Sequence, residues 1–252
     1  MTATFHDLAD ASVFITGGGN GIGAALTDGF LAQGAKVAFV GRSDASAFVD
    51  EMDAKHRNRP LFIQCDITDT DALQDAIAQA AATHGQLNAL VNNAANDARH
   101  EAATITPAYW DDMQAVNLKA YFFACQKAAS VMAPQGAIIN FSSISYMFGA
   151  ADMIAYTTAN AGITGMTRSL AREWGTRGIR VNAIAPGWVF TEKQETLWAT
   201  PESKAAFLER QCIPEPIMPA NMVGPVLFLA SDASRMMTGQ TMVVDAGVVT
   251  TG

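Results

Sequence analysis

Cysteines are scarce in this chain of 252 residues, which has only Cys65, Cys125 and Cys212. The three lie far apart and form no CxxC pair, so the sequence indicates neither a disulfide framework nor a zinc site. We therefore expect buried free thiols, as in a reducing cytosol, and no metal.

Basic runs and long apolar runs are also missing. The 16 Lys and Arg residues are outnumbered by 24 Asp and Glu, and the formal net charge of −8 argues against nucleic-acid binding. No uncharged apolar run reaches the length of about 18 residues needed to span a membrane. The opening MTATFHDLAD has neither the basic nor the apolar region of a signal peptide. We expect a cytoplasmic protein that binds no membrane.

What the chain does contain is typical of a folded globular protein. Half of the residues are apolar and 16% are charged, which excludes a disordered or collagen-like chain. The length is compatible with one α/β domain that covers residues 1–252.

Apolar runs alternate with helix-like segments along the whole chain. Predicted strands cover 12–16, 36–40, 61–65, 89–93, 137–143, 179–185 and 241–245, and predicted helices cover 22–33, 45–56, 69–84, 107–133, 153–175 and 221–230. The strands are continuously apolar, which favours a parallel sheet covered by helices on both faces. Ligands of such sheets bind where the strands end, at their carboxyl ends. The proline-containing stretch 188–220 is predicted to be an irregular substrate lid.

The first predicted strand runs into TGGGNGIG, Thr16 to Gly23. The order of strand, glycine turn and helix lets the backbone approach a pyrophosphate, whose charge the helix N-terminus stabilises. An ordinary strand-to-helix turn is the alternative.

The second predicted strand is followed by Gly41-Arg42-Ser43. An acidic residue normally binds the ribose 2′-hydroxyl of NAD here, whereas an arginine suits the 2′-phosphate of NADP. We expect NADP as the preferred cofactor, and Asp44 keeps NAD open. After the third strand, Asp66 and Ile67 are placed to meet the adenine, or Asp66 is the N-cap of the following helix.

Several motifs together resemble the short-chain dehydrogenase/reductase family: TGGGNGIG, NNAA (92–95), Asn117, Ser143, Tyr156 and PGWVFT (186–191). They stand in the family's order, and the resemblance covers about 8–247. It implies a single Rossmann-type doubly wound domain with a seven-stranded parallel sheet, an NAD(P)-dependent oxidoreductase and a homotetramer. The expected cofactor contacts are Gly17, Asn20, Gly21, Ile22, Gly23, Arg42, Ser43, Asp66, Ile67, Asn93, Ala94, Ala95, Tyr156, Asn160, Pro186, Gly187, Val189 and Thr191.

The same resemblance assigns catalytic roles. Tyr156 is the expected acid/base, Ser143 would hydrogen-bond the reacting oxygen, and Asn117 would hold a water in the proton relay. A tyrosine must have its pKa lowered from about 10 to act as a base near neutral pH. Taken alone, Ser143 would be a serine that caps a turn, and Asn117 a polar helix residue satisfied locally.

One position departs from the family. The family reads YxxxK, and this chain reads YTTAN, so that Asn160 stands where the lysine would bind the ribose and lower the pKa of Tyr156. Three explanations remain open: an engineered change that stalls turnover to trap a complex, a natural variant with slow or redirected catalysis, and a binder that does not catalyse.

The segment NDARH (96–100), with SSIS (142–145) and TEKQ (191–194), resembles bacterial dehydrogenases that oxidise the anomeric carbon of an aldose to a lactone. Candidate substrate residues are Asn96, Arg99, His100, Ser143, Ser145, Tyr156, Trp188, Glu192 and Gln194. Arg99 would alternatively meet an anionic sugar. In the other interpretation, Arg99 and His100 only tie down a loop or an oligomer interface, and Glu192 and Gln194 only cap the start of a mobile helix. The alternative functions are reduction of another keto compound, such as a 3-oxoacyl thioester, and dinucleotide binding without turnover.

Overall fold

The computed structural model describes residues 3–250, and its centre is one parallel sheet. The strands are β1 (Ser12–Thr16), β2 (Lys36–Gly41), β3 (Leu61–Gln64), β4 (Leu87–Asn92), β5 (Met132–Phe141), β6 (Arg180–Pro186) and β7 (Thr241–Val244). Their order in the sheet is β3-β2-β1-β4-β5-β6-β7, and every neighbouring pair is parallel. The predicted seven-stranded Rossmann-type sheet is confirmed.

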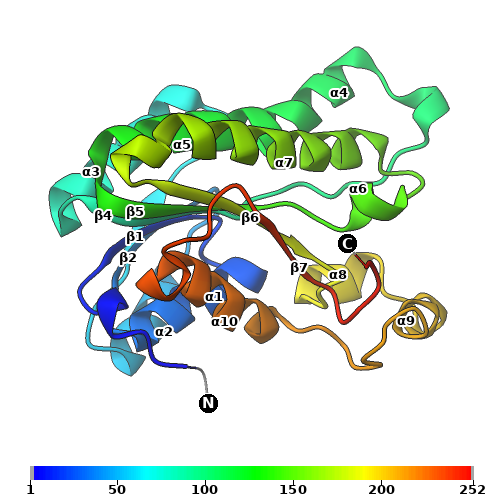
Figure 1. Ribbon diagram of the computed structural model, residues 1–252. Coiled ribbons are helices and arrows are strands. Elements are labelled where there is room, and N and C mark those ends of the chain that lie inside the picture. The colour runs from blue at the N-terminus through cyan, green and yellow to red at the C-terminus, as the bar shows by residue number, and fades with distance from the viewer. Residues whose placement is uncertain (1–2, 251–252) are drawn as a thin grey trace.

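Helices cover both faces of this sheet (Figure 1). One face carries α3 (Thr70–His84), α4 (Pro107–Gln114), α5 (Ala120–Val131) and α7 (Ile154–Trp174). The other carries α1 (Gly21–Ala32), α2 (Ser46–Lys55) and α10 (Val223–Ala230). The short helices α6 (Ser145–Phe148), α8 (Glu192–Leu197) and α9 (Pro201–Leu208) gather at one end of the sheet. No helix of residues 3–250 is both long and apolar enough to cross a membrane.

Each strand supplies both hydrophobic cores because alternate residues point to opposite faces. On β1, Val13 and Ile15 pack into the core under α1 and α10, and Phe14 between them packs into the core under α3, α5 and α7. All three side chains are fully buried. Burial of such a side chain stabilises the fold by about 1.5–3 kcal/mol. This explains why the strands are continuously apolar.

The helix predicted at 107–133 is wrong in its continuity and in its end. The segment is α4, then a turn of π-helix, η3 (Ala115–Lys119), and then α5. It ends at Val131, and β5 begins at Met132, five residues before the strand that the sequence predicts. Pro134 has no N–H to continue the helix and disfavours helical backbone in the residue before it, and the backbone at Gln135 has a positive φ of 66°.

The prediction that the stretch 188–220 is irregular is wrong, because this stretch contains α8 and α9. Thr191 is the N-cap of α8, where its side chain accepts a hydrogen bond from the Gln194 amide. Thr200 caps α9 in the same way, and Pro201 occupies its first turn. Threonine before a helix and proline in its first turn are start signals, although both residue types also mark loops.

Candidate active site

A large open cavity of about 1450 Å³ lies along the carboxyl edge of the sheet. Its wall contains residues that follow six strands in turn: Gly17 after β1, Arg42 after β2, Asp66 after β3, Asn93 after β4, Ser143 after β5 and Gly187 after β6. The chain moves to opposite faces of the sheet after β1 and β4, which are neighbours, so the cavity lies where the winding reverses.

The glycine loop forms one wall of this cavity. Gly17, Asn20 and Ile22 line it, whereas Gly21 and Gly23 are not part of its wall. The backbone of Gly17 has a φ of +70°, and a Cβ on Gly23 would come within 1.9 Å of the Gly17 carbonyl oxygen. Only glycine at both positions lets α1 begin so close to β1. Asn20 precedes α1 and makes no side-chain cap, so its first amides remain available to a pyrophosphate.

Thr16 ties this loop to the segment after β4. Its hydroxyl, in a side chain that is almost fully buried, accepts hydrogen bonds from the Asn93 amide at 2.9 Å and the Ala94 amide at 3.1 Å. The Asn93 side chain donates to the Thr16 and Gly17 carbonyls. Asn93, Ala94 and Ala95 line the cavity as the family resemblance implies.

The end of β2 presents Arg42, Ser43 and Asp44 to the cavity. Arg42 forms no ion pair with any residue in 3–250, and Gln64 fixes its backbone carbonyl with a hydrogen bond of 2.8 Å. The Asp44 carboxylate accepts from the Ser46 hydroxyl at 2.6 Å, and this hydrogen bond lowers the pKa of Asp44. Asp44 therefore already has a partner at the start of α2, whereas the guanidinium of Arg42 does not.

Asp66 and Ile67 line the cavity beyond β3. The Asp66 carboxylate accepts hydrogen bonds from the backbone amide and the hydroxyl of Thr68. The hydrogen bond from the amide is the main reason that the pKa of Asp66 is lowered. The alternative that Asp66 caps the next helix is wrong. The N-cap of α3 is Asp69, whose carboxylate accepts from the Ala72 amide.

The segment after β6 completes the cofactor wall. Pro186, Gly187, Val189 and Thr191 line the cavity. A Cβ on Gly187 would lie 3.0 Å from the Asp245 Cα, so a side chain there would push this segment away from the end of the sheet. The residues present around the cavity therefore fit a bound dinucleotide from its glycine loop to the base of α8.

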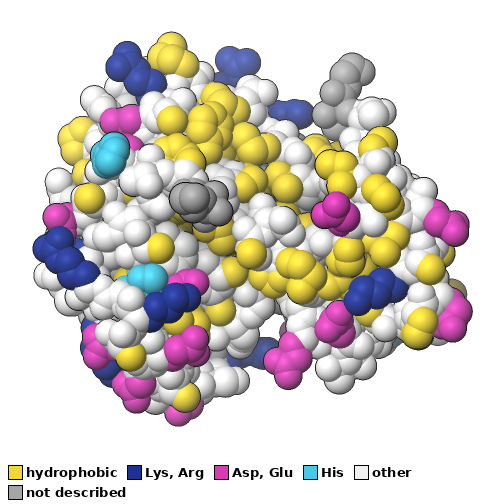
Figure 2. All heavy atoms as spheres, turned by 90° about the horizontal axis from the view of Figure 1, so that it is seen from below, with side chains coloured by type: hydrophobic (Ala, Val, Ile, Leu, Met, Phe, Trp, Pro, Cys, Tyr) yellow, Lys and Arg dark blue, Asp and Glu magenta, His cyan; other side chains and the backbone are white. Residues whose placement is uncertain are grey.

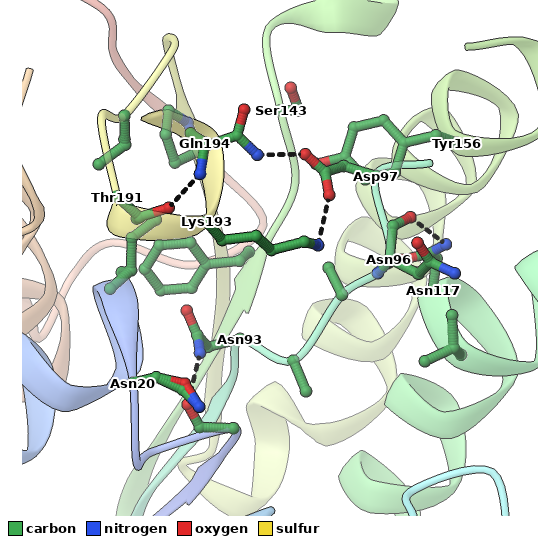
Figure 3. A pocket seen from close by; sticks show the side chains of 18 of the residues that line it. Asn20, Asn93, Asn96, Asp97, Asn117, Ser143, Tyr156, Thr191, Lys193 and Gln194 are labelled. Carbon is green, nitrogen blue, oxygen red and sulfur yellow. Dashed lines mark hydrogen bonds and ion pairs between the residues drawn. The ribbon is translucent and has the colours of Figure 1, made fainter. Parts of the chain in front are cut away.

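Tyr156 and Ser143 meet at the inner end of the cavity, as Figure 3 shows. Burial, together with the negative charge of Asp97, raises the pKa of Tyr156 to about 12, although hydrogen bonding to Ser143 and Asn160 acts in the opposite direction. The Ser143 hydroxyl accepts from the Ser145 amide at 3.1 Å, which orients it. Ser143 therefore caps a turn and also lines the cavity beside Tyr156.

Asn160 lies below Tyr156 on α7 and is only 2% exposed. Its side-chain amide donates to the Tyr156 carbonyl at 2.8 Å, one helical turn away. The backbone carbonyl of Asn160 accepts a hydrogen bond from the Ser142 hydroxyl at 3.0 Å. The side chain is bonded to its own helix and carries no charge, so the structure offers no cation at this position to stabilise a tyrosinate.

Asn117 lies in the π-helix η3 and is also 2% exposed. Its carbonyl oxygen accepts from the Asn96 amide at 2.8 Å, and its amide donates to the Asn96 carbonyl at 3.0 Å and the Met113 carbonyl at 2.9 Å. These bonds hold the loop after β4 on both backbone groups of Asn96 (Figure 3). Single turns of π-helix recur at functional sites, and here the turn aims Asn117 at the cavity.

A polar contact that the sequence does not reveal connects this loop to α8. The Asp97 carboxylate forms an ion pair with Lys193 at 2.8 Å and accepts a hydrogen bond from the Gln194 amide (Figure 3). Burial by itself would raise the pKa of Asp97, but its bonds to Lys193 and Gln194 keep it below the usual value. We call Asp97, Lys193 and Gln194 the latch. The Trp188 indole donates to the same Gln194 at 2.8 Å.

The remaining predicted substrate residues do not all reach the cavity. Asn96, Arg99, Ser145, Trp188 and Gln194 line it. Ser145 is 6% exposed, and its hydroxyl has no partner among the described residues.

His100 and Glu192 are absent from the cavity wall. The His100 ring packs on Tyr109 at 4.6 Å, so this histidine ties down its loop. Glu192 lines a smaller hollow between α8 and the glycine loop, together with Asn20 and Gly21. Thr191, and neither Glu192 nor Gln194, caps α8.

Sequence reasoning missed several residues of the cavity wall besides Asp97 and Lys193. They include Phe148 on α6, Phe207 at the end of α9, Arg210 just after it, and Asp112 on α4. No spacing rule marks them, because they belong to different elements. The aromatic and basic content of the region after β6 is a signal for Phe207 and Arg210 only.

Comparison with known proteins assigns this chain to a family. A family model described as enoyl-(acyl carrier protein) reductase matches residues 17–249. The chain belongs to the short-chain dehydrogenase/reductase family. It is similar to the "Probable galactose dehydrogenase GalD" of Rhizobium meliloti (46% identical over 251 residues) and to the D-xylose 1-dehydrogenase of Caulobacter vibrioides (43% over 249). In both comparisons 98% of each chain is covered.

A solved structure supports the same assignment. A blue fluorescent protein from a metagenomic library, in complex with NADPH, superposes with a TM-score of 0.90 at 32% identity, covering 97% of this chain and all of its own. The predictions of a short-chain family member and of an NAD(P)-dependent dehydrogenase are confirmed. The tyrosine and serine that the resemblance singles out face the cavity that fits the cofactor.

Proposed function

We propose that this enzyme oxidises the anomeric carbon of an aldose to a lactone, with NADP as the preferred cofactor. The observation that carries the proposal is the meeting of Tyr156 and Ser143 at the inner end of a cavity whose outer wall fits a dinucleotide. The similarity to relatives named galactose and D-xylose dehydrogenases, over 98% of the chain, supports a sugar as the small-molecule substrate.

In this proposal Tyr156 accepts the proton of the anomeric hydroxyl, and Ser143 donates a hydrogen bond that orients the oxygen. When bound, NADP⁺ would supply the acceptor for the hydride of the same carbon, and loss of the proton and the hydride would convert the carbon–oxygen single bond into the lactone carbonyl. Asn117 acts as a positioning residue, because it holds the Asn96 backbone at the edge of the site. Asn96, Ser145 and Gln194 are placed to bond sugar hydroxyls, which lose water on binding.

The cofactor preference is supported by the end of β2. Arg42 has an unpaired guanidinium at the cavity, and Asp44, the acidic residue that would favour NAD, is bonded to Ser46. A 2′-phosphate would supply the bidentate partner that Arg42 lacks. NAD, which has only hydroxyls at this point, is expected to bind more weakly.

Asn160 is expected to make turnover slow rather than to prevent cofactor binding. A cation that shifted the pKa of Tyr156 by three units would contribute about 4 kcal/mol, and the asparagine supplies no such charge. Its amide nevertheless leaves the fold of α7 intact, because it is satisfied within the helix.

The test compares the chain with its Asn160→Lys form on a panel of neutral and acidic aldoses, and follows the absorbance of the reduced cofactor with NADP⁺ and with NAD⁺. We expect the lysine form to raise kcat by at least tenfold on one or a few sugars and to favour NADP⁺. Tyr156→Phe in the lysine form is the control and should abolish turnover. If both forms bind NADP⁺ and neither oxidises any sugar, the proposal is wrong.

A further inference from the structure

Cationic side chains from three separate segments line the cavity at its substrate side. Arg99 comes from the loop after β4, Lys193 from α8, and Arg210 from the turn after α9. The whole chain has a formal net charge of −8, so a local excess of positive charge at this place is not a reflection of composition.

Two of the three cations have no counter-charge. Lys193 is paired with Asp97 at 2.8 Å, whereas neither Arg99 nor Arg210 forms an ion pair within residues 3–250. Asp112, the remaining carboxylate on this side of the cavity, lies on α4 and pairs with neither arginine. The two guanidinium groups therefore remain available to an anion.

Aromatic rings hold both guanidinium groups. The Arg99 guanidinium carbon lies 4.7 Å from the centre of the Trp198 ring. That of Arg210 lies 4.5 Å from Phe148 and 5.5 Å from Phe207. A guanidinium that packs on an aromatic ring contacts the ring with its flat face. Its N–H donors lie in its own plane and therefore stay free to bind another group. Neither group donates a hydrogen bond to a described residue, as a preorganised anion site requires.

We infer that the sugar substrate carries an anionic group, a carboxylate, sulfonate, sulfate or phosphate, at the end remote from the oxidised carbon, and that Arg99 and Arg210 bind it. Oxygens of such a group match the parallel N–H donors of arginine. The neutral remainder of the sugar would lie between this group and Tyr156. This inference rests on the proposed function, because it assumes an aldose in the cavity.

The test measures dissociation constants by calorimetry in the presence of NADPH, since the reduced cofactor prevents oxidation of the sugar during the titration. D-galactose is compared with D-galacturonate and with D-galactose 6-sulfate and 6-phosphate, and D-glucose with D-glucuronate. We expect one anionic member to bind at least tenfold more tightly than its neutral partner, and the difference to shrink as salt is added.

Variants assign the anion to its arginines. Arg99→Gln and Arg210→Gln should each reduce the preference for the anionic sugar by about tenfold, and Arg210→Lys should reduce it less. Lys204→Gln is the matched control, because Lys204 is a cation on α9 that lies outside the cavity wall. It should leave the preference unchanged.

The outcomes separate the two proposals. If a neutral sugar binds as tightly as its anionic partner, or if the preference survives both arginine variants, the inference fails and the sugar dehydrogenase stands. If NADPH binds and no sugar does, neutral or anionic, both fail. If one anionic sugar is preferred, its identity distinguishes a sugar acid from a sulfated or phosphorylated sugar.

Discussion

Tyr156 is the residue whose chemistry depends most on its neighbours. Burial and the charge of Asp97 both favour its neutral form, so its pKa is raised to about 12. The lysine that would oppose them is replaced by Asn160, which is bonded to its own helix. A phenol in this environment stays protonated near neutral pH, so very little tyrosinate is present to act as a base.

This environment predicts an unusual pH dependence of oxidation. The rate of the chain as it stands should rise about tenfold per pH unit and reach no plateau below pH 10, because the deprotonated Tyr156 population grows up to the pKa of about 12. In Asn160→Lys the plateau should move to lower pH, since a nearby positive charge favours tyrosinate. The measurement is log kcat/KM against pH for both forms. Profiles that coincide would contradict this account of Asn160.

The sequence predicts part of the site at this scale. Tyr156, Ser143, Asn117 and the glycine loop belong to motifs with fixed spacing, so they can be found without coordinates. The contact between Asp97 and Lys193 joins residues 96 positions apart, and an ion pair leaves no spacing signature. The same holds for Arg210, which reaches the cavity only because α9 folds back over it.

At the scale of elements, the latch is the contact that joins α8 to the body of the molecule over the cavity. Asp97 comes from the loop after β4, and Lys193 and Gln194 come from the first turn of α8. The Asp97 side chain is 21% exposed, so its bonds are partly shielded from water and worth more than a surface ion pair. The position of α8 should therefore depend on this carboxylate.

Replacing the carboxylate tests this dependence. In Asp97→Ala we expect backbone amides of residues 192–198 to exchange hydrogen about tenfold faster, since loss of bonds to a charged group costs about 1.5 kcal/mol or more. The measurement is hydrogen exchange followed by mass spectrometry. Glu195→Gln is the control, because it removes an ion pair that joins Glu195 of α8 to Lys204 of α9 and does not involve the loop after β4. Equal exchange in Asp97→Ala and the unchanged chain would show that the latch does not hold α8.

The predicted helix over 107–133 shows where element-scale prediction fails. Its apolar periodicity is continuous enough to read as one helix, but a π-helical turn inserts into it at Ala115–Lys119. Asn117 lies in this turn, and its side-chain amide donates to the Asn96 and Met113 carbonyls. Tertiary contacts, rather than local preference, decide the backbone there.

At the scale of the whole molecule, the sheet follows directly from the sequence. Seven continuously apolar segments alternate with helical ones, and a parallel sheet with covered faces is the arrangement that buries all of them. The strand order places β1 beside β4, which brings the glycine loop and the Asn93 segment together. The substrate side is not predictable in the same way, because short helices after β6 form it and their packing sets its shape.

The surface predicts self-association. Figure 2 shows hydrophobic side chains gathered over much of the face seen from below, and Ile213 (57% exposed), Met218 (45%) and Met236 (87%) are among the exposed large apolar residues of the molecule. Apolar surface of this kind usually marks an interface. We expect sedimentation at micromolar concentration to give the mass of a homotetramer, and Met236→Lys to weaken the assembly. A monomer at that concentration would contradict the expectation.

The hydrogen bond from the Asn160 amide to its own helix also has a consequence for how this position can mutate. A lysine codon becomes an asparagine codon by a change of its third base alone. The asparagine side chain is compatible with the fold, because its amide is hydrogen-bonded within α7. In a lineage carrying such a gene, we expect a protein that folds and binds its cofactor while it turns over its substrate slowly. The reverse mutation, equally small, would restore the chemistry without any other part of the molecule having to change.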